Sequence, residues 1–404
     1  MSSSSRFDVC VVGGGLVGLS VARALVDRFD GLSLVLLDKE SEVARHQSSH
    51  NSGVVHSGLY YKPGSLKARL CVEGRQKTYE MCEGEGIPYQ RSGKLVIATD
   101  PSEIPALDEL ERRGTANGLI GLRRIGPEEI REIEPEATGL DALHVPEAGV
   151  ADFPAMARHH ADALERAGAR IETNAEVGAV TQDGNEVVAM AGERSFAARV
   201  LVNCAGLHAD RVAALTGVIP AVRIVPFRGE YYKLTEEASS LVRTLIYPVP
   251  DPRFPFLGVH FTRRIDGTVQ VGPNAVLALG REHYRGARAD WRELGSIISY
   301  SGFRKLAGQH WRAGMAEMLN SRSARLYARL ARRLLPALRR EHLIQGGAGV
   351  RAQAVDARGG LVDDFVIETA GRAVHVLNAP SPGATASIAI GRYIAEQVSP
   401  ILRS

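Results

Sequence analysis

The stretch Phe7-Asp-Val-Cys-Val-Val-Gly-Gly-Gly-Leu-Val-Gly18, followed after a helical segment by Leu34-Val-Leu-Leu-Asp38, decides the fold. It predicts a buried strand, a glycine turn, a helix and a second strand that ends in an acid. Gly13 permits the tight turn, Gly15 leaves room for a pyrophosphate against the backbone, and Gly18 lets the helix lie close to the strand. The helix start also offers free N–H groups and the positive end of its dipole to phosphates.

Asp38 stands 20 residues after Gly18, where its carboxylate can accept hydrogen bonds from ribose hydroxyls. The other contacts predicted in this unit are Gly14, Val17 and Lys39. A plain glycine turn is the alternative interpretation. The strand before the turn, the helix after it and the acid at this distance favour a dinucleotide site.

A second turn, far downstream, favours FAD over NAD. The stretch Arg199-Val-Leu-Val-Asn-Cys-Ala-Gly206 is an apolar strand that ends in Ala205 and Gly206. Such a strand can return to the first sheet and place a turn without large side chains against the cofactor. Because an NAD domain would continue without the long interruption between residues 40 and 195, the sheet is predicted to be built from separated segments, as in FAD enzymes. The alternative is that this strand belongs to the core alone.

Composition sets the class of protein. The chain has 404 residues, 45% of them hydrophobic, which is enough for two domains of ordinary size. Its net charge of +3 is too near neutral to indicate a nucleic-acid partner. The four cysteines show no C-x-x-C pair and no metal-ligand spacing, so no metal is predicted. With no signal peptide and no apolar run of about 18 residues, the sequence favours a cytoplasmic protein without a membrane span.

A polar loop from Lys39 to Gly58 follows the first unit and is dense in Ser, His, Asn and Gly. Donor-rich loops after a nucleotide strand often contact the ligand. The cofactor contacts predicted in this loop are Ser48, His50, Asn51 and Ser52. The alternative is an ordered loop capped by its own side chains. Further along, Val177 ends a strand and is predicted to pair its backbone with adenine.

The remaining sequence predicts alternating helices and strands. Helices are expected at 66–84, 101–134, 153–167 with Asp152 as N-cap, 289–342 and 383–398; strands at 94–99, 170–177, 184–202, 361–368 and 373–377; and a glycine turn at 346–350. Alternating runs between Val222 and Val276, including Leu257–Thr262, predict an antiparallel sheet. The fold class is therefore α/β, with a Rossmann-like FAD-binding domain from 1–90, 148–221 and 343–404. A substrate domain with an antiparallel β-sheet is expected from 91–147 and 222–342.

Longer motifs carry a family resemblance. The block His46-Gln-Ser-Ser-His-Asn-Ser-Gly-Val-Val-His-Ser-Gly-Leu-Tyr-Tyr-Lys-Pro-Gly-Ser-Leu-Lys67 resembles L-2-hydroxyglutarate dehydrogenases and oxidases. So do Tyr247–Thr262, Gly272–Leu277, Gly347–Gln353 and Asn378–Thr385. The family belongs to a larger group of FAD oxidoreductases similar to D-amino-acid oxidase and glycine oxidase. The resemblance covers nearly the whole chain. It implies FAD, a two-domain fold and oxidation of L-2-hydroxyglutarate to 2-oxoglutarate by hydride transfer to the flavin.

The resemblance also implies two parts of the site. In the wider group an arginine in a Gly-x-Arg turn binds the substrate carboxylate, and Arg351 matches it. A guanidinium suits this role because it stays charged and binds a carboxylate through two parallel hydrogen bonds. The alternative is that Arg351 pairs with Asp363 or Asp364. A glycine-rich helix start that lies against the flavin is matched by Pro382, Gly383, Ala384 and Thr385.

Oxidation of the alcohol also needs a base for the hydroxyl proton, and histidine has an ordinary pKa near neutrality. His56 lies in the polar loop, and His260 lies in an alternating run that puts it on the same side as Thr262. One of the two histidines is predicted to be the base, with a packing role as the alternative for each. Candidates for binding the second carboxylate are Lys62, Arg228, Tyr231 and Arg263, each of which could equally be a surface charge.

Residues 281–342 are strongly basic, with 14 Arg or Lys against 5 acids. Leu326, Leu330, Leu334 and Leu338 repeat at a four-residue spacing among arginines that include Arg322, and Pro336 is expected to kink the helix. One interpretation is an amphipathic helix packed on its own domain. The other is a surface that meets anionic lipid at the inner face of the membrane and passes electrons to a quinone. The sequence leaves oxygen or a quinone open as the electron acceptor.

Two other functions stay open. The first is an FAD-dependent amino-acid or amine oxidase of the same fold. The second is a flavoprotein without turnover, such as a subunit of an electron-transfer complex. The block that ends at His260 and the Ser-Pro-Gly-Ala-Thr helix start favour the hydroxy-acid enzyme.

Overall fold

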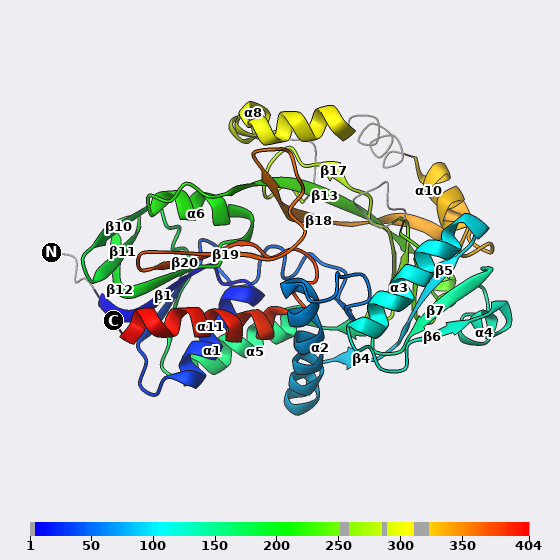
Figure 1. Ribbon diagram of the computed structural model, residues 1–404, viewed down its shortest axis with the longest axis horizontal. Coiled ribbons are helices and arrows are strands. Elements are labelled where there is room, and N and C mark those ends of the chain that lie inside the picture. The colour runs from blue at the N-terminus through cyan, green and yellow to red at the C-terminus, as the bar shows by residue number, and fades with distance from the viewer. Residues whose placement is uncertain (1–4, 251–257, 285–288, 311–322, 404) are drawn as a thin grey trace.

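The computed structural model describes residues 5–250, 258–284, 289–310 and 323–403, and its strands form three sheets (Figure 1). In the eight-stranded first sheet, neighbours in the order β20-β12-β1-β2-β9 run parallel. The antiparallel strands β10, β11 and β19 extend it. The strands are β1 (Ser5–Val12), β2 (Leu34–Leu37), β9 (Arg170–Glu172), β10 (Ala179–Asp183), β11 (Glu186–Ala191), β12 (Arg194–Asn203), β19 (Val366–Ala370) and β20 (Ala373–Asn378).

Strand periodicity explains the two faces of this sheet. Val9 and Val11 point into a core shared with the helices, whereas Cys10 and Val12 point into a separate cluster beneath β10 and β11. The helices on the first face are α1 (Leu16–Arg28), α5 (Phe153–Arg166) and α11 (Ser387–Arg403), which pack side by side (Figure 1). Asp152 caps α5, as predicted, by accepting a hydrogen bond from the Ala155 N–H.

The nine-stranded second sheet has the order β17-β13-β16-β15-β14-β5-β7-β6, with β18 on β13. Its pairs are antiparallel except for β14 with β5. Its strands are β5 (Lys94–Ala98), β6 (Arg123–Ile125), β7 (Asp141–Val145), β13 (Val222–Leu234), β14 (Leu245–Pro248), β15 (Phe261–Arg263), β16 (Val269–Val271), β17 (Val276–Leu277) and β18 (Leu343–Asp356). The predicted α/β fold with an antiparallel second sheet is confirmed.

A small third sheet and the remaining helices surround these layers. The sheet consists of β3 (Val54–Val55), β4 (Tyr89–Gln90) and β8 (Gly149–Ala151). The helices are α2 (Leu66–Glu85), α3 (Ile104–Ala116), α4 (Pro127–Ile133), α6 (Ala209–Leu215), α7 (Glu236–Ser239), α8 (Trp291–Ser299) and α10 (Ala324–Ala331), with 3₁₀ turns η1 (Pro101–Glu103), η2 (Gly206–His208) and η3 (Arg340–His342). Residues 301–310 are also helical. None of the helices in the described ranges is long and apolar enough to cross a bilayer.

The glycine turn predicted at 346–350 is wrong, because these residues lie inside β18. The glycines there serve close approach. A Cβ atom on Gly346 would lie 2.5 Å from the Tyr231 carbonyl oxygen, and one on Gly349 would lie 2.5 Å from the His50 carbonyl oxygen. Arg351 consequently lies on a strand, opposite Phe227 of β13, and not in a turn.

Other boundaries also differ from prediction. A strand, β6, interrupts the segment 101–134 that was expected to be mainly helical. The final helix starts at Ser387 after a series of turns, and β19 starts at Val366. The strand expected at Leu257–Thr262 is described only from Gly258, and β15 begins at Phe261, so His260 directly precedes it. The two domain boundaries stay a prediction; β18, directly after residue 342, pairs with β13 of the second sheet.

Gly391 provides a test of how α11 packs on α1. A Cβ atom at this position would lie 2.4 Å from the Ser20 carbonyl oxygen. We expect Gly391→Ala to lower the free energy of unfolding by about 1–3 kcal/mol, because the helices must move apart. Gly295→Ala in α8 is the matched control, since no atom lies within 4 Å of its Cβ position. Thermal unfolding of both variants checks this expectation, and equal midpoints would contradict it.

Candidate active site

A cavity of about 1110 Å³ opens where the parallel strands of the first sheet end. Gly13, Asp38 and Cys204 directly follow β1, β2 and β12, and all three line it. Ligands of open α/β sheets bind in such a crevice at the carboxyl ends of the strands. Residues of β18 from the second sheet line the cavity as well, so both sheets contribute to one site.

The structure brings almost all of the predicted site residues to this cavity. Those that line it are Gly13, Gly15, Val17, Asp38, Lys39, Ser48, His50, Asn51, Ser52, His56, Val177, Ala205, Gly206, His260, Arg351, Pro382, Gly383, Ala384 and Thr385. Gly14 and Gly18 are the two predicted cofactor contacts that do not line it. The individual roles of all these residues stay predictions. The contacts of each residue indicate what it could do.

The glycine turn is fixed by contacts that no side chain could share. Gly13 has a φ of +107°, and a Cβ atom on it would lie 2.4 Å from the Cys204 carbonyl oxygen. A Cβ atom on Gly18 would lie 1.9 Å from the Gly13 carbonyl oxygen. The backbone of β1, the start of α1 and the end of β12 therefore meet in one place. This cradle at a helix N-terminus fits the pyrophosphate of FAD.

Asp38 and Ser48 hold the chain around that cradle. The Asp38 carboxylate accepts hydrogen bonds from the N–H groups of Gly14, at 2.6 Å, and Glu40, at 2.8 Å. The Ser48 hydroxyl accepts one from the Leu16 N–H at 2.9 Å, at the start of α1. Both side chains order the turn, and oxygen lone pairs remain for a ligand.

Asn51 and His50 order the polar loop itself. The Asn51 amide donates to the carbonyl oxygens of Gln47 and Ser48 and accepts from the Gly53 N–H. His50 stacks on Tyr284 with ring centroids 4.1 Å apart. The alternative of a loop capped by its own side chains therefore describes Asn51, even though it also lines the cavity.

The turn that precedes α11 lies against this loop. The His56 N–H donates to the Thr385 hydroxyl at 3.1 Å, and that hydroxyl donates to the Val54 carbonyl oxygen at 3.2 Å. Ser381 Oγ lies 3.3 Å from His56 Nε2. Two segments far apart in sequence are thus joined beside the first candidate base.

Arg351, His260 and several tyrosines form another part of the cavity wall. The ring of His260 stacks on Tyr247 at 4.1 Å, and its Nδ1 lies 2.8 Å from the Gly258 carbonyl oxygen. Because a carbonyl oxygen only accepts, Nδ1 carries the proton and Nε2 has a free lone pair. Asp363 pairs with Lys67 at 2.7 Å, and Asp364 accepts from the N–H groups of Lys67 and Phe365. The two acids proposed as alternative partners of Arg351 are therefore engaged by other groups.

Burial keeps both candidate histidines neutral. It lowers the pKa of His260 to about 3, with the nearby charges of Lys94 and Arg351 acting in the same direction. Burial also lowers the pKa of His56 well below its usual range, helped by the charges of Lys94 and Lys67. A neutral imidazole is the form that accepts a proton, so both residues are in the state that a base requires.

Among the four candidates for the second carboxylate, only Tyr231 lines the cavity. Lys62 is exposed, Arg228 lies 2.6 Å from Glu230, and Arg263 donates to the carbonyl oxygens of Ser239 and Val242. Sequence reasoning missed other residues of the wall, namely Tyr60, Tyr61, Lys67, Tyr247 and Gln353. All five lie inside the sequence blocks that resemble L-2-hydroxyglutarate dehydrogenases. That resemblance was the signal that could have identified them.

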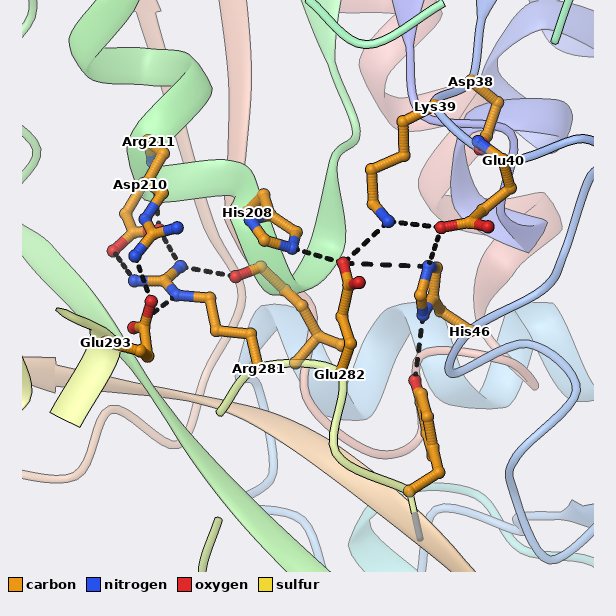
Figure 2. A network of polar contacts seen from close by, with 12 residues as sticks. Asp38, Lys39, Glu40, His46, His208, Asp210, Arg211, Arg281, Glu282 and Glu293 are labelled. Atoms are coloured by element: carbon orange, nitrogen blue, oxygen red, sulfur yellow. Dashed lines mark hydrogen bonds and ion pairs between the residues drawn. The ribbon is translucent and has the colours of Figure 1, made fainter. Parts of the chain in front are cut away.

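A polar network fastens the connection that follows β17 to the polar loop that follows β2 (Figure 2). Glu282 lies 2.7 Å from Lys39 Nζ and 2.7 Å from His208 Nε2. Lys39 also pairs with Glu40, whose carboxylate lies 2.9 Å from His46 Nε2. Glu40, His46 and Glu282 are grouped closely enough to hold a cation, and the Lys39 ammonium bridges the two acids. The predicted cofactor contact Lys39 is therefore part of an ion-pair network.

The same segment is held from its other side. Arg281 is buried and pairs with Asp210 and, at 2.8 Å, with Glu293 (Figure 2). Several charge-assisted hydrogen bonds satisfy this guanidinium, which a buried charge requires. Consecutive residues, Arg281 and Glu282, thus tie the connection after β17 to α6, α8 and the loop after β2.

Sequence comparison agrees with this geometry. The model of a family described as FAD dependent oxidoreductase (DAO) matches residues 8–397. The chain belongs to this family. The cofactor of this oxidoreductase is FAD, and the cradle of glycines described above fits it.

Relatives of this chain point to a narrower group within the family. The chain is 45% identical to L-2-hydroxyglutarate dehydrogenase of Indibacter alkaliphilus, over 96% of this chain and 98% of that protein. It is 44% identical to the human mitochondrial L-2-hydroxyglutarate dehydrogenase, over 98% and 89%, and 43% identical to the Escherichia coli L-2-hydroxyglutarate dehydrogenase, over 98% and 94%. The resemblance identified from the sequence motifs is confirmed.

Solved structures support the fold. L-alpha-glycerophosphate oxidase from Mycoplasma pneumoniae, with FAD bound, aligns with a TM-score of 0.79 at 23% identity, covering 99% of this chain and 95% of that one. Glycine oxidase from Geobacillus kaustophilus aligns with a TM-score of 0.74 at 19% identity, covering 98% and 95%. At these identities the likeness concerns the architecture alone.

The Glu282 network predicts a pH-dependent contribution to stability. Hydrogen bonds from His208 and then Lys39 lower the pKa of Glu282 from its usual 4.5 to about 2, against the effect of burial. The contribution is therefore present above about pH 4.5 and is lost as the pH falls towards 2. We expect Glu282→Gln to lower the thermal midpoint by about 1–3 °C at pH 7, because the carboxylate is 36% exposed and its ion pairs are screened.

Thermal unfolding of the wild type and the variant at a series of pH values from 7 to 3 measures this effect. The difference between the two proteins should shrink below pH 4.5. Glu341→Gln is the matched control, since Glu341 and its partner Arg339 are both highly exposed. A difference that is constant with pH would show that the carboxylate contributes by packing alone.

Proposed function

We propose that this chain oxidises L-2-hydroxyglutarate to 2-oxoglutarate with FAD. The observation that carries the proposal is the 45% identity, along nearly the whole of both chains, to a protein named L-2-hydroxyglutarate dehydrogenase. The cavity supports it chemically. Its lining provides an arginine and two neutral histidines, which is what orienting a 2-hydroxy acid and removing its hydroxyl proton require.

The glycine turn Gly13–Gly18, Asp38, the polar loop and the turn before α11 would hold the cofactor, as their position along the cavity supports. When bound, FAD supplies the hydride acceptor. Arg351 binds the carboxylate next to the reacting carbon through its guanidinium fork, which orients that carbon. Its place on β18, paired to β13, supports the role because a strand in a sheet holds a side chain more rigidly than a turn does.

His260 is the better supported base. Its Nδ1 proton is held by the Gly258 carbonyl oxygen, which leaves Nε2 ready to accept the hydroxyl proton of the substrate. The stack on Tyr247 fixes the plane of the ring. His56 is the second candidate, and its contacts with Ser381 and Thr385 favour a role in joining the loop to the cofactor turn.

Anaerobic reduction tests the proposed reaction. The purified holoenzyme should lose its flavin absorbance when L-2-hydroxyglutarate is added without oxygen, and 2-oxoglutarate should form in equal amount. The D-enantiomer serves as the control. Bleaching by L-amino acids or amines would instead support the alternative of an amino-acid or amine oxidase. No bleaching by any of these compounds would support a flavoprotein without turnover.

Variants assign the roles in the same experiment. His260→Gln should slow bleaching by about 10²–10⁴-fold, the usual contribution of a general base. Arg351→Met should weaken the binding of any 2-hydroxy acid. A larger loss in His56→Gln than in His260→Gln would identify His56 as the base.

The basic stretch 281–342 concerns the question of the electron acceptor. Oxygen and a membrane quinone are the two candidates. Helix α10 buries Tyr327 and Ala331 against the core and exposes its arginines, and it ends before Pro336. Arg322 lies outside the described residues. On α8, Trp291 is 77% exposed. Support for peripheral contact with anionic lipid is thus an exposed aromatic side chain on α8 and exposed arginines on α10, both in the basic stretch of the chain.

Flotation with anionic vesicles tests this contact. The holoenzyme should float with phosphatidylglycerol vesicles at low salt and detach as the salt concentration rises. Trp291→Ser should bind more weakly, whereas Ile219→Ser, which changes an even more exposed apolar residue elsewhere, should not. If the wild type stays in solution at low salt, a soluble acceptor such as oxygen is left.

A further inference from the structure

Lys94 is a buried ammonium group beside the cavity. It opens β5, is 1% exposed, and its Nζ makes no hydrogen bond to any residue in the described ranges. Two rings lie beneath the ammonium, that of Tyr247 with its centroid at 4.2 Å and that of Tyr60 at 5.2 Å. Cation–π contacts offset part of the cost of burial, but they satisfy none of the three N–H donors.

An unpaired buried ammonium group lowers the stability of the folded protein. Burial of a charge without a paired anion is expensive, and buried polar groups normally have partners. Burial lowers the pKa of Lys94 to about 8, and among the described residues only the Cys71 thiol counteracts this shift. Lys67, the neighbouring buried lysine, shows the contrast, because it pairs with Asp363 at 2.7 Å.

Other unsatisfied groups lie around Lys94. The Tyr60 hydroxyl and His56 Nδ1 are buried and also lack a hydrogen-bond partner among the described residues. Tyr60, Tyr247 and His56 all line the cavity, and the charge of Lys94 acts on both His56 and His260. The unpaired ammonium and the unpaired hydroxyl therefore adjoin the part of the cavity that contains the candidate bases.

We propose that Lys94, together with the Tyr60 hydroxyl, binds the second carboxylate of a dicarboxylic 2-hydroxy acid. The flexible four-carbon stem of lysine lets the ammonium turn from the tyrosine rings towards an anion in the cavity. This inference rests on the proposed function and adds to it the residue that selects a diacid over a monoacid. Lys94 does not line the cavity itself, but it packs on Tyr247 and Tyr60, which do. It replaces Lys62, which is exposed, and Arg228 and Arg263, which bind other groups.

Ligand binding to Lys94→Met separates this role from turnover. The probes are glutarate, a diacid without a hydroxyl group, and butyrate, a monoacid, each titrated against the visible spectrum of the holoenzyme. We expect the Kd of glutarate to rise about 10- to 100-fold in the variant, since one charge-assisted contact is lost, and that of butyrate to stay unchanged. With substrates, kcat/KM for L-2-hydroxyglutarate should fall by a similar factor while that for L-2-hydroxybutyrate stays the same.

The pH dependence is a readout that a merely structural lysine would not produce. In the wild type, glutarate should bind more weakly above about pH 8, where Lys94 loses its proton. In Lys94→Met this dependence should disappear. Tyr60→Phe removes only a hydroxyl group, should reproduce a smaller part of the effect, and keeps the proposal testable if Lys94→Met yields no folded holoenzyme.

Two controls frame the result. Arg351→Met should weaken the diacid and the monoacid alike, and Lys62→Met should change neither. Equal losses for both acids in Lys94→Met and Tyr60→Phe, or no loss, would overturn the inference. A wild type that binds glutarate but is not bleached by L-2-hydroxyglutarate would refute the proposed reaction while leaving Lys94 testable as a dicarboxylate site.

Discussion

The structure depends on the contact between the Gly13 backbone and the Cys204 carbonyl oxygen, which leaves no space for a side chain. This contact brings together the ends of two strands that are separated by most of the first half of the chain. It also sets the start of α1 at the edge of the cavity, where its N–H groups face a ligand. The glycines leave room at this edge, and residues of β18 from the second sheet line the same cavity.

The chemistry of the site follows from burial. Imidazoles removed from water and surrounded by positive groups stay neutral, and the same positive groups favour an anionic ligand. Tyr60 and Tyr247 give this part of the cavity an aromatic wall, and charges beside apolar surface interact more strongly than charges in water. A negatively charged substrate therefore completes an arrangement in which the protein alone has an excess of positive charge.

Local patterns allowed correct predictions where the physics is local. The close approach of Gly18 to the Gly13 carbonyl oxygen, the Asp152 cap and the helix from Leu66 depend on neighbouring residues, and each was placed correctly. The glycines near Gly349 were misread as a turn because what demands them is the His50 carbonyl oxygen, distant in sequence. Lys94 was overlooked for the same reason, since only the assembled sheets show that its charge is buried. The clue in the sequence was a charged residue at the head of the apolar run Leu95–Ala98.

The contact between Gly349 and His50 also connects two parts of the site, the polar loop and the strand that carries Arg351. The polar loop contacts β18 at Gly349, two residues before Arg351. Because β18 is paired with β13 along most of its length, this part of the strand cannot bend independently. A shift of the loop at His50 would therefore move the strand that carries Arg351. If a ligand at the loop and a carboxylate at Arg351 are coupled through this contact, thermodynamic reciprocity requires that each change the affinity of the other by the same factor.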